Sequence, residues 1–345
     1  MELQKIYKEV ENRIQRINFE ALWENFHPFN FALYSEEIVC FCGRLLPRTD
    51  EFIANTTRYY ENKWIAIWHL SEETDLDILT AKIIHEMFHA YQMEMGEKRF
   101  ANEIVAVRKY RYIPKEMEIR YRENELMAEL VDSFCIDTWN RLLAYRKYRK
   151  IHYAYEYQYM MQIEAIEGAA QYVETEVLRQ LDPEKYNSFI NMLIHRITKI
   201  DYLIPIRTFC YDTGSLFLKL CKDNRIPIDY SIGISTSAYC EKLLDVEDCN
   251  EEIIVRDEIE KYAENDMQNV KHKTLGIIET ADAIYKENYQ LVAFDPYGAR
   301  NYNSYIYTHF LKVIGEREYM CCGDVVFLMN EFNQISEIYV KNDMQ

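Results

Sequence analysis

The sequence HEMFH at residues 85–89 decides the expected fold and chemistry of this chain. It lies inside a stretch, about 75–95, in which apolar residues recur at helical spacing. Side chains four residues apart lie on one face of a helix, so the imidazoles of His85 and His89 can reach one ion. The H-E-x-x-H pattern is typical of zinc sites in which the intervening glutamate, here Glu86, is the general base. We therefore expect a zinc helix at this position.

Zinc held by two histidines needs a third protein ligand and, for catalysis, an open position for water. Carboxylates occur in two downstream helical strings, EGAAQYVE, which begins at Glu167, and ELMAELVD, which contains Glu125 and Glu129. Gly168 favours the first string, because glycine inside a helix costs about 0.5–1 kcal/mol relative to alanine and so indicates a close backbone approach. A ligand helix that crosses the zinc helix has that need. We expect Glu167 to be the third ligand, with Glu125 or Glu129 as the alternative.

A carboxylate that accepts the outer ring N–H of a zinc-bound histidine fixes the tautomer of that histidine. With Glu167 as the ligand, the residues Glu125, Glu129 and Asp132 become candidates for this supporting role. An ordinary solvated helix face explains the same three residues equally well, so both interpretations stay open.

Together with the string Tyr211-Asp-Thr-Gly214, these motifs resemble the ordered signature of the gluzincin metallopeptidases, in particular the aminopeptidase N type. In that family the two histidines and the glutamate of an E-G-x-A motif bind zinc, and the glutamate between the histidines is the base. The tyrosine of a Y-x-x-G motif stabilises the oxyanion. The resemblance implies these roles for His85, His89, Glu167, Glu86 and Tyr211.

The resemblance covers roughly residues 60–220 and departs from the family at two points. The segment between His89 and Glu167 is much longer than in aminopeptidases and contains an extra helical stretch at about 114–149. The G-x-M-E-N motif with which aminopeptidases hold a free α-amine is missing. The resemblance therefore does not imply that the protein removes amino-terminal residues.

The expected function is peptide-bond hydrolysis by a zinc-activated water, with one Zn²⁺ per chain and a peptide or protein as substrate. The strand expected at Trp64–Leu70 precedes the zinc helix and is the candidate to align a substrate through backbone hydrogen bonds. The alternative is a catalytically inactive protein that keeps a zincin fold for binding.

The alternation of β-rich and helical parts predicts an α+β fold that is mainly helical. Short β-rich runs between turn residues predict a small antiparallel or mixed N-terminal sheet packed on a helical bundle. The string TLGIIETADAIY, from residue 274, opens a second β-rich part. The expected parts are a zincin-like domain over 1–245 (sheet about 30–70, ligand helix about 153–181), an acidic helix or linker over 246–267, and a small α+β domain over 268–345.

The composition excludes several classes of protein. With 49% hydrophobic residues the chain can bury a substantial core, which excludes disorder. The net charge of −17 argues against nucleic acid or an anionic membrane surface as a partner, since both are bound through Lys and Arg. The 9 cysteines are scattered without a Cys-x-x-Cys pair, which is typical of reduced thiols, so we expect a cytoplasmic protein.

Overall fold

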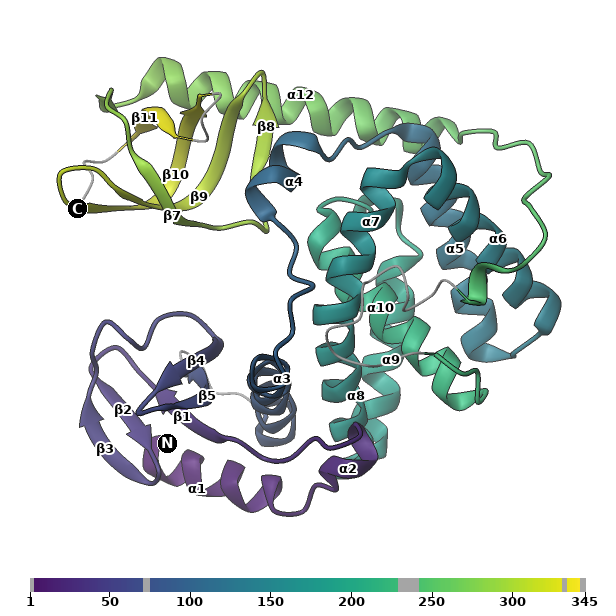
Figure 1. Ribbon diagram of the computed structural model, residues 1–345, viewed down its shortest axis with the longest axis horizontal. Helices are drawn as coiled ribbons and strands as arrows, with labels where there is room; N and C mark the ends of the chain where they lie inside the picture. Colours follow the sequence, from purple (N-terminus) through teal and green to yellow (C-terminus); the bar gives the residue numbers. More distant parts are fainter. Residues whose placement is uncertain (1–2, 71–74, 229–241, 331–333, 342–345) are drawn as a thin grey trace.

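The computed structural model describes residues 3–70, 75–228, 242–330 and 334–341, which form an α+β fold. A small sheet is followed along the chain by a body of helices and then by a second sheet with one long helix (Figure 1). The predicted class, α+β and mainly helical, is confirmed. The helices of the described residues are α1 (Leu3–Ile14), α2 (Phe19–Leu22), α3 (Leu76–Glu94), α4 (Glu103–Lys109), α5 (Pro114–Asp132), α6 (Ile136–His152), α7 (Ala154–Ile163), α8 (Ala169–Leu181), α9 (Pro183–Ile197), α10 (Ile206–Asp223) and α12 (Asp257–Thr280).

The N-terminal sheet is mixed. Its strands, in the spatial order β3-β2-β1-β5-β4, are β1 (Asn30–Tyr34), β2 (Ile38–Phe41), β3 (Arg44–Pro47), β4 (Thr56–Tyr60) and β5 (Lys63–His69). Strands β1 and β5 run parallel, and the other pairs are antiparallel. Alternate side chains face opposite sides of the sheet: Phe31 and Leu33 join the core that contains α1 and α3, whereas Ala32 and Tyr34 pack with Phe52.

The place of β5 in this sheet corrects one sequence-based expectation. The stretch Trp64–Leu70 is predicted to align a peptide through free backbone groups, but β5 lies between β1 and β4 and is paired on both sides. Among the described residues, β4 is the strand at this edge of the sheet, and it lies against α3. Periodicity identifies a strand but not its neighbours, so the sequence pattern alone could not separate an edge strand from an interior one.

Helix α3 forms where the sequence predicts the zinc helix. Asp75 caps its N-terminus by accepting hydrogen bonds from the backbone N–H groups of Asp77 and Ile78. Beyond its C-terminus, Gly96 has φ = +75°, a left-handed conformation that glycine adopts without strain. The helix packs against β5 on one side and α8 on the other. Its central residues are therefore buried, including the polar side chains of His85 and Glu86.

The middle of the chain is helical, but its elements differ from the predicted ones in two ways. The helix expected at about 114–149 is two helices, α5 and α6, because the backbone is extended at Ser133 and Cys135. No glycine or proline marks this break, so helical periodicity runs across it. The helix expected at about 153–181 is continuous, but its centre, η1 (Glu164–Gly168), is π-helical. Such π-helical turns are rare in proteins as a whole, but those that occur are often found at functional sites.

Three arginines at the centre of the helical body are fully buried with carboxylate partners. The shortest N–O distances are 2.9 Å for Arg120–Glu116, 2.7 Å for Arg149–Glu123 and 3.0 Å for Arg146–Glu164. Each buried positive charge is thus paired with a buried negative charge. Such pairing is needed because an unpaired charge removed from water is very costly. Because Glu164 belongs to η1, this network ties α6 to the π-helical segment.

The C-terminal unit consists of α12 and an antiparallel sheet. Its strands are β6 (Ala283–Tyr285), β7 (Gln290–Phe294), β8 (Arg300–Tyr302), β9 (Tyr305–Ile314), β10 (Glu318–Met329) and β11 (Ile335–Val340). The spatial order is β6-β11-β10-β9-β7, with β8 beside β9. Residues of these strands, including Ile306, Leu311 and Phe327, form a separate hydrophobic core.

Helix α12 corrects the expected layout around the acidic segment. The predicted boundary at residue 268 falls inside this helix, and residues 274–280, expected as the start of a β-rich part, form its last turns. Ile259, Ala263 and Ile277 are buried along one side of α12. Ile259 and Ala263 join the core of the helical body, whereas Ile277 packs with residues of the C-terminal strands. These contacts outweigh the β-rich local composition.

The eight cysteines among the described residues are all free thiols. Their environments range from the buried core, as for Cys210, to the exposed surface, as for Cys135. No helix in the described parts of the chain combines the length and the apolar composition needed to cross a membrane.

Candidate metal centre

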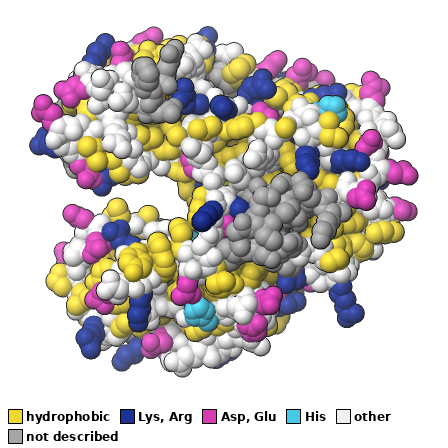
Figure 2. All heavy atoms as spheres, in the orientation of Figure 1, with side chains coloured by type: hydrophobic (Ala, Val, Ile, Leu, Met, Phe, Trp, Pro, Cys, Tyr) yellow, Lys and Arg dark blue, Asp and Glu magenta, His cyan; other side chains and the backbone are white. Residues whose placement is uncertain are grey.

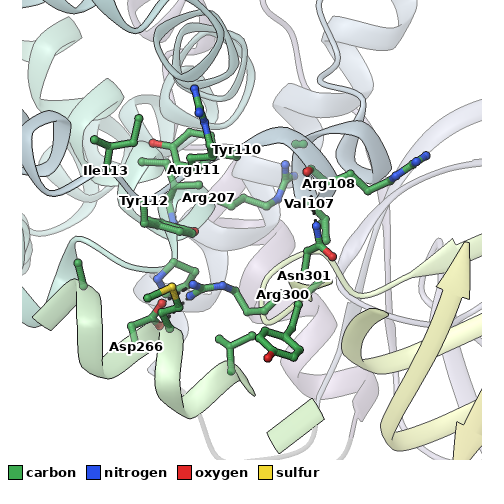
Figure 3. A pocket seen from close by; sticks show the side chains of 18 of the residues that line it. Val107, Arg108, Tyr110, Arg111, Tyr112, Ile113, Arg207, Asp266, Arg300 and Asn301 are labelled. Carbon is green, nitrogen blue, oxygen red and sulfur yellow. Dashed lines mark hydrogen bonds and ion pairs between the residues drawn. The ribbon is translucent and has the colours of Figure 1, made fainter. Parts of the chain in front are cut away.

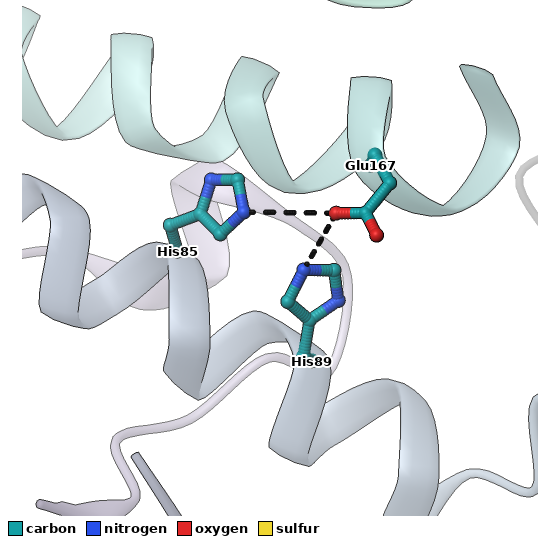
Figure 4. A group of neighbouring side chains, drawn as sticks. All are labelled: His85, His89 and Glu167. Carbon is teal, nitrogen blue, oxygen red and sulfur yellow. Dashed lines mark ion pairs between the residues drawn. The ribbon is translucent and has the colours of Figure 1, made fainter. Parts of the chain in front are cut away.

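Three of the predicted site residues converge between α3 and the π-helical segment η1. His85 and His89 lie one turn apart on α3 and point toward Glu167 on the facing helix (Figure 4). Oε2 of Glu167 lies 3.1 Å from Nε2 of His89 and 4.0 Å from Nε2 of His85. One donor atom from each residue falls within 4.8 Å of the others, so the group could hold one metal ion. The alternative ligands Glu125 and Glu129 do not belong to it.

The outer ring nitrogens of both histidines also have partners. Nδ1 of His89 lies 2.7 Å from Oε1 of Gln92, whose amide group donates to the carbonyl oxygen of Ile166 in η1. Nδ1 of His85 lies 3.1 Å from Oε2 of Glu174, an ion-pair distance, although the two atoms are not aligned for a hydrogen bond. Both rings therefore present Nε2 toward Glu167, with that of His89 held by a hydrogen bond and that of His85 facing a carboxylate. Such support of the outer nitrogen is typical of histidines that bind metals.

The structure contradicts the role considered for the acidic residues of α5 as partners of the outer histidine nitrogens. Glu125 is half exposed and pairs with Arg256 at 2.7 Å. Glu129 accepts a hydrogen bond from Thr138, and Asp132 is exposed. All three lie on α5, whereas the outer nitrogens of His85 and His89 face Glu174 and Gln92. The carboxylate beside His85 comes from Glu174 on α8, seven residues after Glu167.

The charges of the centre are strongly coupled. Burial by itself would raise the pKa of Glu167, but His89, Arg207 and His85 outweigh it and hold that pKa well below its usual range. Burial would lower the pKa of His89, yet the neighbouring carboxylate of Glu167 raises it to about 9. Burial raises the pKa of Glu86, partly offset by the two histidines. Glu86 is thus a carboxylate with raised basicity directly beside the possible metal ligands.

Tyr211, the tyrosine singled out by the family resemblance, also lies at the centre. Its ring is nearly parallel to that of His85, with the ring centroids 6.3 Å apart and an interplanar angle of 11°. Burial and the charge of Glu167 raise the pKa of its hydroxyl, so Tyr211 is a neutral donor near physiological pH. The residue lies within α10.

Two residues that the sequence reasoning missed surround Tyr211. Arg207, one turn earlier on α10, binds Oε1 of Glu167 at 2.6 Å and also pairs with Glu103. The hydroxyl of Tyr297, from the C-terminal unit, lies 2.7 Å from the hydroxyl of Tyr211. The carboxylate of Glu167 therefore presents one oxygen to the histidines and the other to a guanidinium.

A pocket of about 490 Å³ lies between the helical body and the C-terminal unit (Figure 3). Its walls include Arg207 and Tyr297, together with Tyr112, Asp266 and Arg300. The volume falls within the range of small-molecule sites. In the space-filling view, a wide hollow also separates the part built on the N-terminal sheet from the C-terminal unit (Figure 2). The candidate centre therefore has a neighbouring pocket that shares two of its residues.

Comparison of the chain with known protein families, with curated proteins and with solved structures found no match. The donor set itself fits zinc, which binds imidazole nitrogen and carboxylate oxygen and in catalytic sites takes three protein ligands.

Proposed function

We propose that the protein is a zinc-dependent peptidase of the gluzincin type with a zincin-like fold in its N-terminal and helical parts. The observation that carries this proposal is the convergence of His85, His89 and Glu167 with Glu86 buried beside them. Three ligands leave a position open for water, whereas structural zinc sites usually have four protein ligands. A hydrolytic centre accounts for this arrangement better than a structural one.

His85, His89 and Glu167 would hold one Zn²⁺ per chain through Nε2 of each histidine and Oε2 of the glutamate. When bound, zinc would lower the pKa of a water molecule toward about 7 and polarise the carbonyl group of the substrate. Glu174 and Gln92 keep the two imidazole rings oriented from their outer nitrogens. Arg207 holds the second oxygen of Glu167 and so fixes which oxygen faces the histidines.

Glu86 transfers the proton, and Tyr211 stabilises the negative charge that develops on the substrate. The carboxylate of Glu86 accepts a proton from the attacking water and then gives it to the leaving amine, a task that its raised pKa suits. The hydroxyl of Tyr211 donates a hydrogen bond to the carbonyl oxygen of the scissile bond as negative charge develops there. The loss of a single donor of this kind typically costs about 10²–10³ in rate.

Strand β4 replaces residues 64–70 as the element that aligns the substrate. It lies at the edge of the N-terminal sheet among the described residues and packs beside α3. An extended peptide that adds to this edge gains backbone hydrogen bonds, while its side chains alternate between the two faces. The substrate class that fits is an extended peptide or protein segment, and the free thiols are consistent with a cytoplasmic location.

The proposal is tested by metal analysis and by hydrolysis of a mixed peptide library with and without a zinc chelator. We expect about one zinc per chain. Glu86→Gln should retain zinc, but its rate of peptide hydrolysis should fall at least about 10²-fold, because the general base is gone. A protein that binds no zinc, or a Glu86→Gln variant with full turnover, would contradict the proposal.

The ligand assignment has its own matched pair of variants. Glu167→Ala should weaken zinc binding far more than Glu125→Ala, because Glu125 pairs with Arg256 away from the histidines. Zinc affinity is measured by competition with a chelator of known strength. The reverse order of effects would identify Glu125 of α5 as the third ligand.

A non-hydrolytic binding protein with the same fold remains the second candidate, and one observation favours it. Arg207 and His89 together already pair with both oxygens of Glu167, so this carboxylate has partners without any metal ion. In that case the purified protein contains no stoichiometric zinc and cleaves no peptide. Metal content and the library assay therefore separate the two functions.

A further inference from the structure

Tyr297 brings the C-terminal unit into direct contact with the candidate centre. It lies in the loop between β7 and β8, and its hydroxyl oxygen is 2.7 Å from that of Tyr211. The two rings are 6.3 Å apart between centroids, and the ring of Tyr211 is also nearly parallel to that of His85, with their centroids 6.3 Å apart. The C-terminal unit, which the family resemblance does not cover, thus supplies a polar atom one hydrogen bond away from the proposed donor.

The loop that carries Tyr297 is fixed to its own sheet. The backbone N–H of Tyr297 donates to the carboxylate of Asp295 at 2.9 Å. The backbone of Asp295 is in turn held by strand β9: its N–H donates to the carbonyl oxygen of Phe310, and its carbonyl oxygen accepts from the hydroxyl of Thr308. An Asx-type turn of this kind restricts the backbone, so the main chain at Tyr297 is held against the sheet.

The same loop is also attached to the helix that carries Tyr211. Arg300, at its end, pairs with Asp266 of α12 and lies over the ring of Tyr112 at 4.4 Å. The hydroxyl of Tyr112 accepts a hydrogen bond from the backbone N–H of Ile206 at the start of α10. The C-terminal unit is therefore anchored at the turn of α10 that immediately precedes Arg207.

Arg207 links the two tyrosines to the proposed metal ligand. Its guanidinium carbon lies 5.2 Å from the ring centroid of Tyr297 and 6.0 Å from that of Tyr211. The same guanidinium binds Glu167. Any displacement of Tyr297 would thus disturb the surroundings of both the donor and the ligand.

We propose that Tyr297 is a positioning residue for hydrolysis and that the C-terminal unit thereby completes the active site. This inference rests on the proposed function. A phenol hydroxyl rotates about its C–O bond and can donate one hydrogen bond while it accepts another. When Tyr297 donates to the oxygen of Tyr211, the hydrogen of Tyr211 is left to point at the substrate carbonyl. Donors that are oriented before the reaction are the ones that stabilise a transition state effectively.

The test compares Tyr297→Phe, Tyr211→Phe and the double variant with the wild-type protein on a peptide from the library. Tyr297→Phe should lower kcat by about three- to tenfold, the range expected for one net hydrogen bond, with KM and zinc affinity unchanged. The double variant should be no slower than Tyr211→Phe, because Tyr297 acts through Tyr211. Tyr319→Phe, which removes a hydroxyl elsewhere in the C-terminal sheet, is the matched control and should leave kcat unchanged.

Three kinetic outcomes would overturn the inference. If Tyr297→Phe turns over at the wild-type rate, its hydroxyl does not position the donor. If the effects of Tyr297→Phe and Tyr211→Phe multiply in the double variant, Tyr297 acts independently of Tyr211. A change confined to KM would likewise assign Tyr297 to substrate binding.

A spectroscopic readout keeps this inference separate from the proposed function. With tyrosine isotope-labelled at the Cζ carbon, the NMR resonance of Tyr211 is assigned by its loss in Tyr211→Phe. It should shift in Tyr297→Phe and stay in place in Tyr319→Phe, because the Cζ shift responds to the hydrogen bond of the hydroxyl. If no peptide is cleaved, the proposed function fails, while an unshifted Tyr211 resonance in Tyr297→Phe overturns the inference on its own.

Discussion

Gly168 and Gly214 pack backbone against backbone, so closely that a Cβ atom on Gly168 would lie 2.7 Å from the Cα atom of Gly214. Gly168 follows the proposed ligand Glu167, and Gly214 lies three residues after Tyr211. The glycines of the two sequence motifs are therefore partners of each other. Their contact sets the distance between η1 and α10, and with it the spacing between the proposed ligand and the proposed donor.

Gly168→Ala should destabilise the protein, because the added methyl group meets backbone atoms that cannot rotate away. Overpacking of this kind typically costs about 1–3 kcal/mol. Denaturant unfolding followed by circular dichroism measures the loss. The control is Gly276→Ala in α12, where an added Cβ has no neighbour within 4 Å. That variant should be stabilised by about 0.5–1 kcal/mol through helix propensity. Equal effects at the two positions would mean that the contact carries no strain.

The sequence predicted the features that depend on local pattern. Helix α3 follows from apolar periodicity, and the convergence of His85 with His89 follows from their spacing of four residues. The close approach at Gly168 was predicted correctly, but its partner was not: the sequence argument placed the zinc helix there, whereas the structure places Gly214 of α10. A helical glycine signals a near backbone without identifying it.

Apart from the convergence of Glu167 with the two histidines, contacts between distant parts of the chain were not predicted. Glu174 lies two helical turns after Glu167, so the spacing of the two residues predicts that they share a helix face. No feature of the sequence, however, favours Glu174 over Glu125 as the partner of a histidine. Arg207 has a similar signal, one turn before Tyr211. Tyr297 had none, because its role depends on how the C-terminal unit packs on α10. The edge position of β4 likewise depends on strand order rather than on pattern.

Glu174→Gln should weaken zinc binding while the fold is kept. The carboxylate of Glu174 lies 3.1 Å from Nδ1 of His85, and loss of such a partner typically costs about 10–100-fold in metal affinity. Competition with a chelator measures the affinity. Glu176→Gln is the matched control, since Glu176 is a buried glutamate on the same helix that pairs with Arg179. Equal affinity losses for both variants would show that Glu174 has no specific role.

The cap of α3 should make this helix sensitive to acid. Burial would raise the pKa of Asp75, but hydrogen bonds from Lys185 and from the backbone of α3 outweigh it and lower that pKa. A carboxyl group with a lowered folded-state pKa stabilises the fold fully above its unfolded pKa of about 3.9, and this stabilisation is lost as the pH falls through the folded pKa. The ion pair is partly exposed, so its contribution is within about 1 kcal/mol.

Asp75→Asn tests this contribution, because asparagine still caps the helix but cannot form the ion pair with Lys185. The variant should unfold at a lower temperature than the wild-type protein at neutral pH. The difference should shrink below about pH 4 and vanish once Asp75 is protonated in both states. Thermal unfolding followed by circular dichroism across this range gives the comparison. A difference that grows as the pH falls would have the wrong sign for a lowered pKa.

Removal of one partner from the buried charge network should be costly. In Arg146→Met, Glu164 would keep the hydrogen bond from Thr213 but lose its guanidinium partner, and breaking a buried pair in this way typically costs about 3–5 kcal/mol. Glu164 lies three residues before Glu167, so zinc affinity should fall as well. The double variant Arg146→Met/Glu164→Gln removes the stranded charge and should recover much of the stability. Urea unfolding decides the matter: a double variant no more stable than Arg146→Met would show that the loss comes from packing of Arg146 against Phe217 rather than from charge.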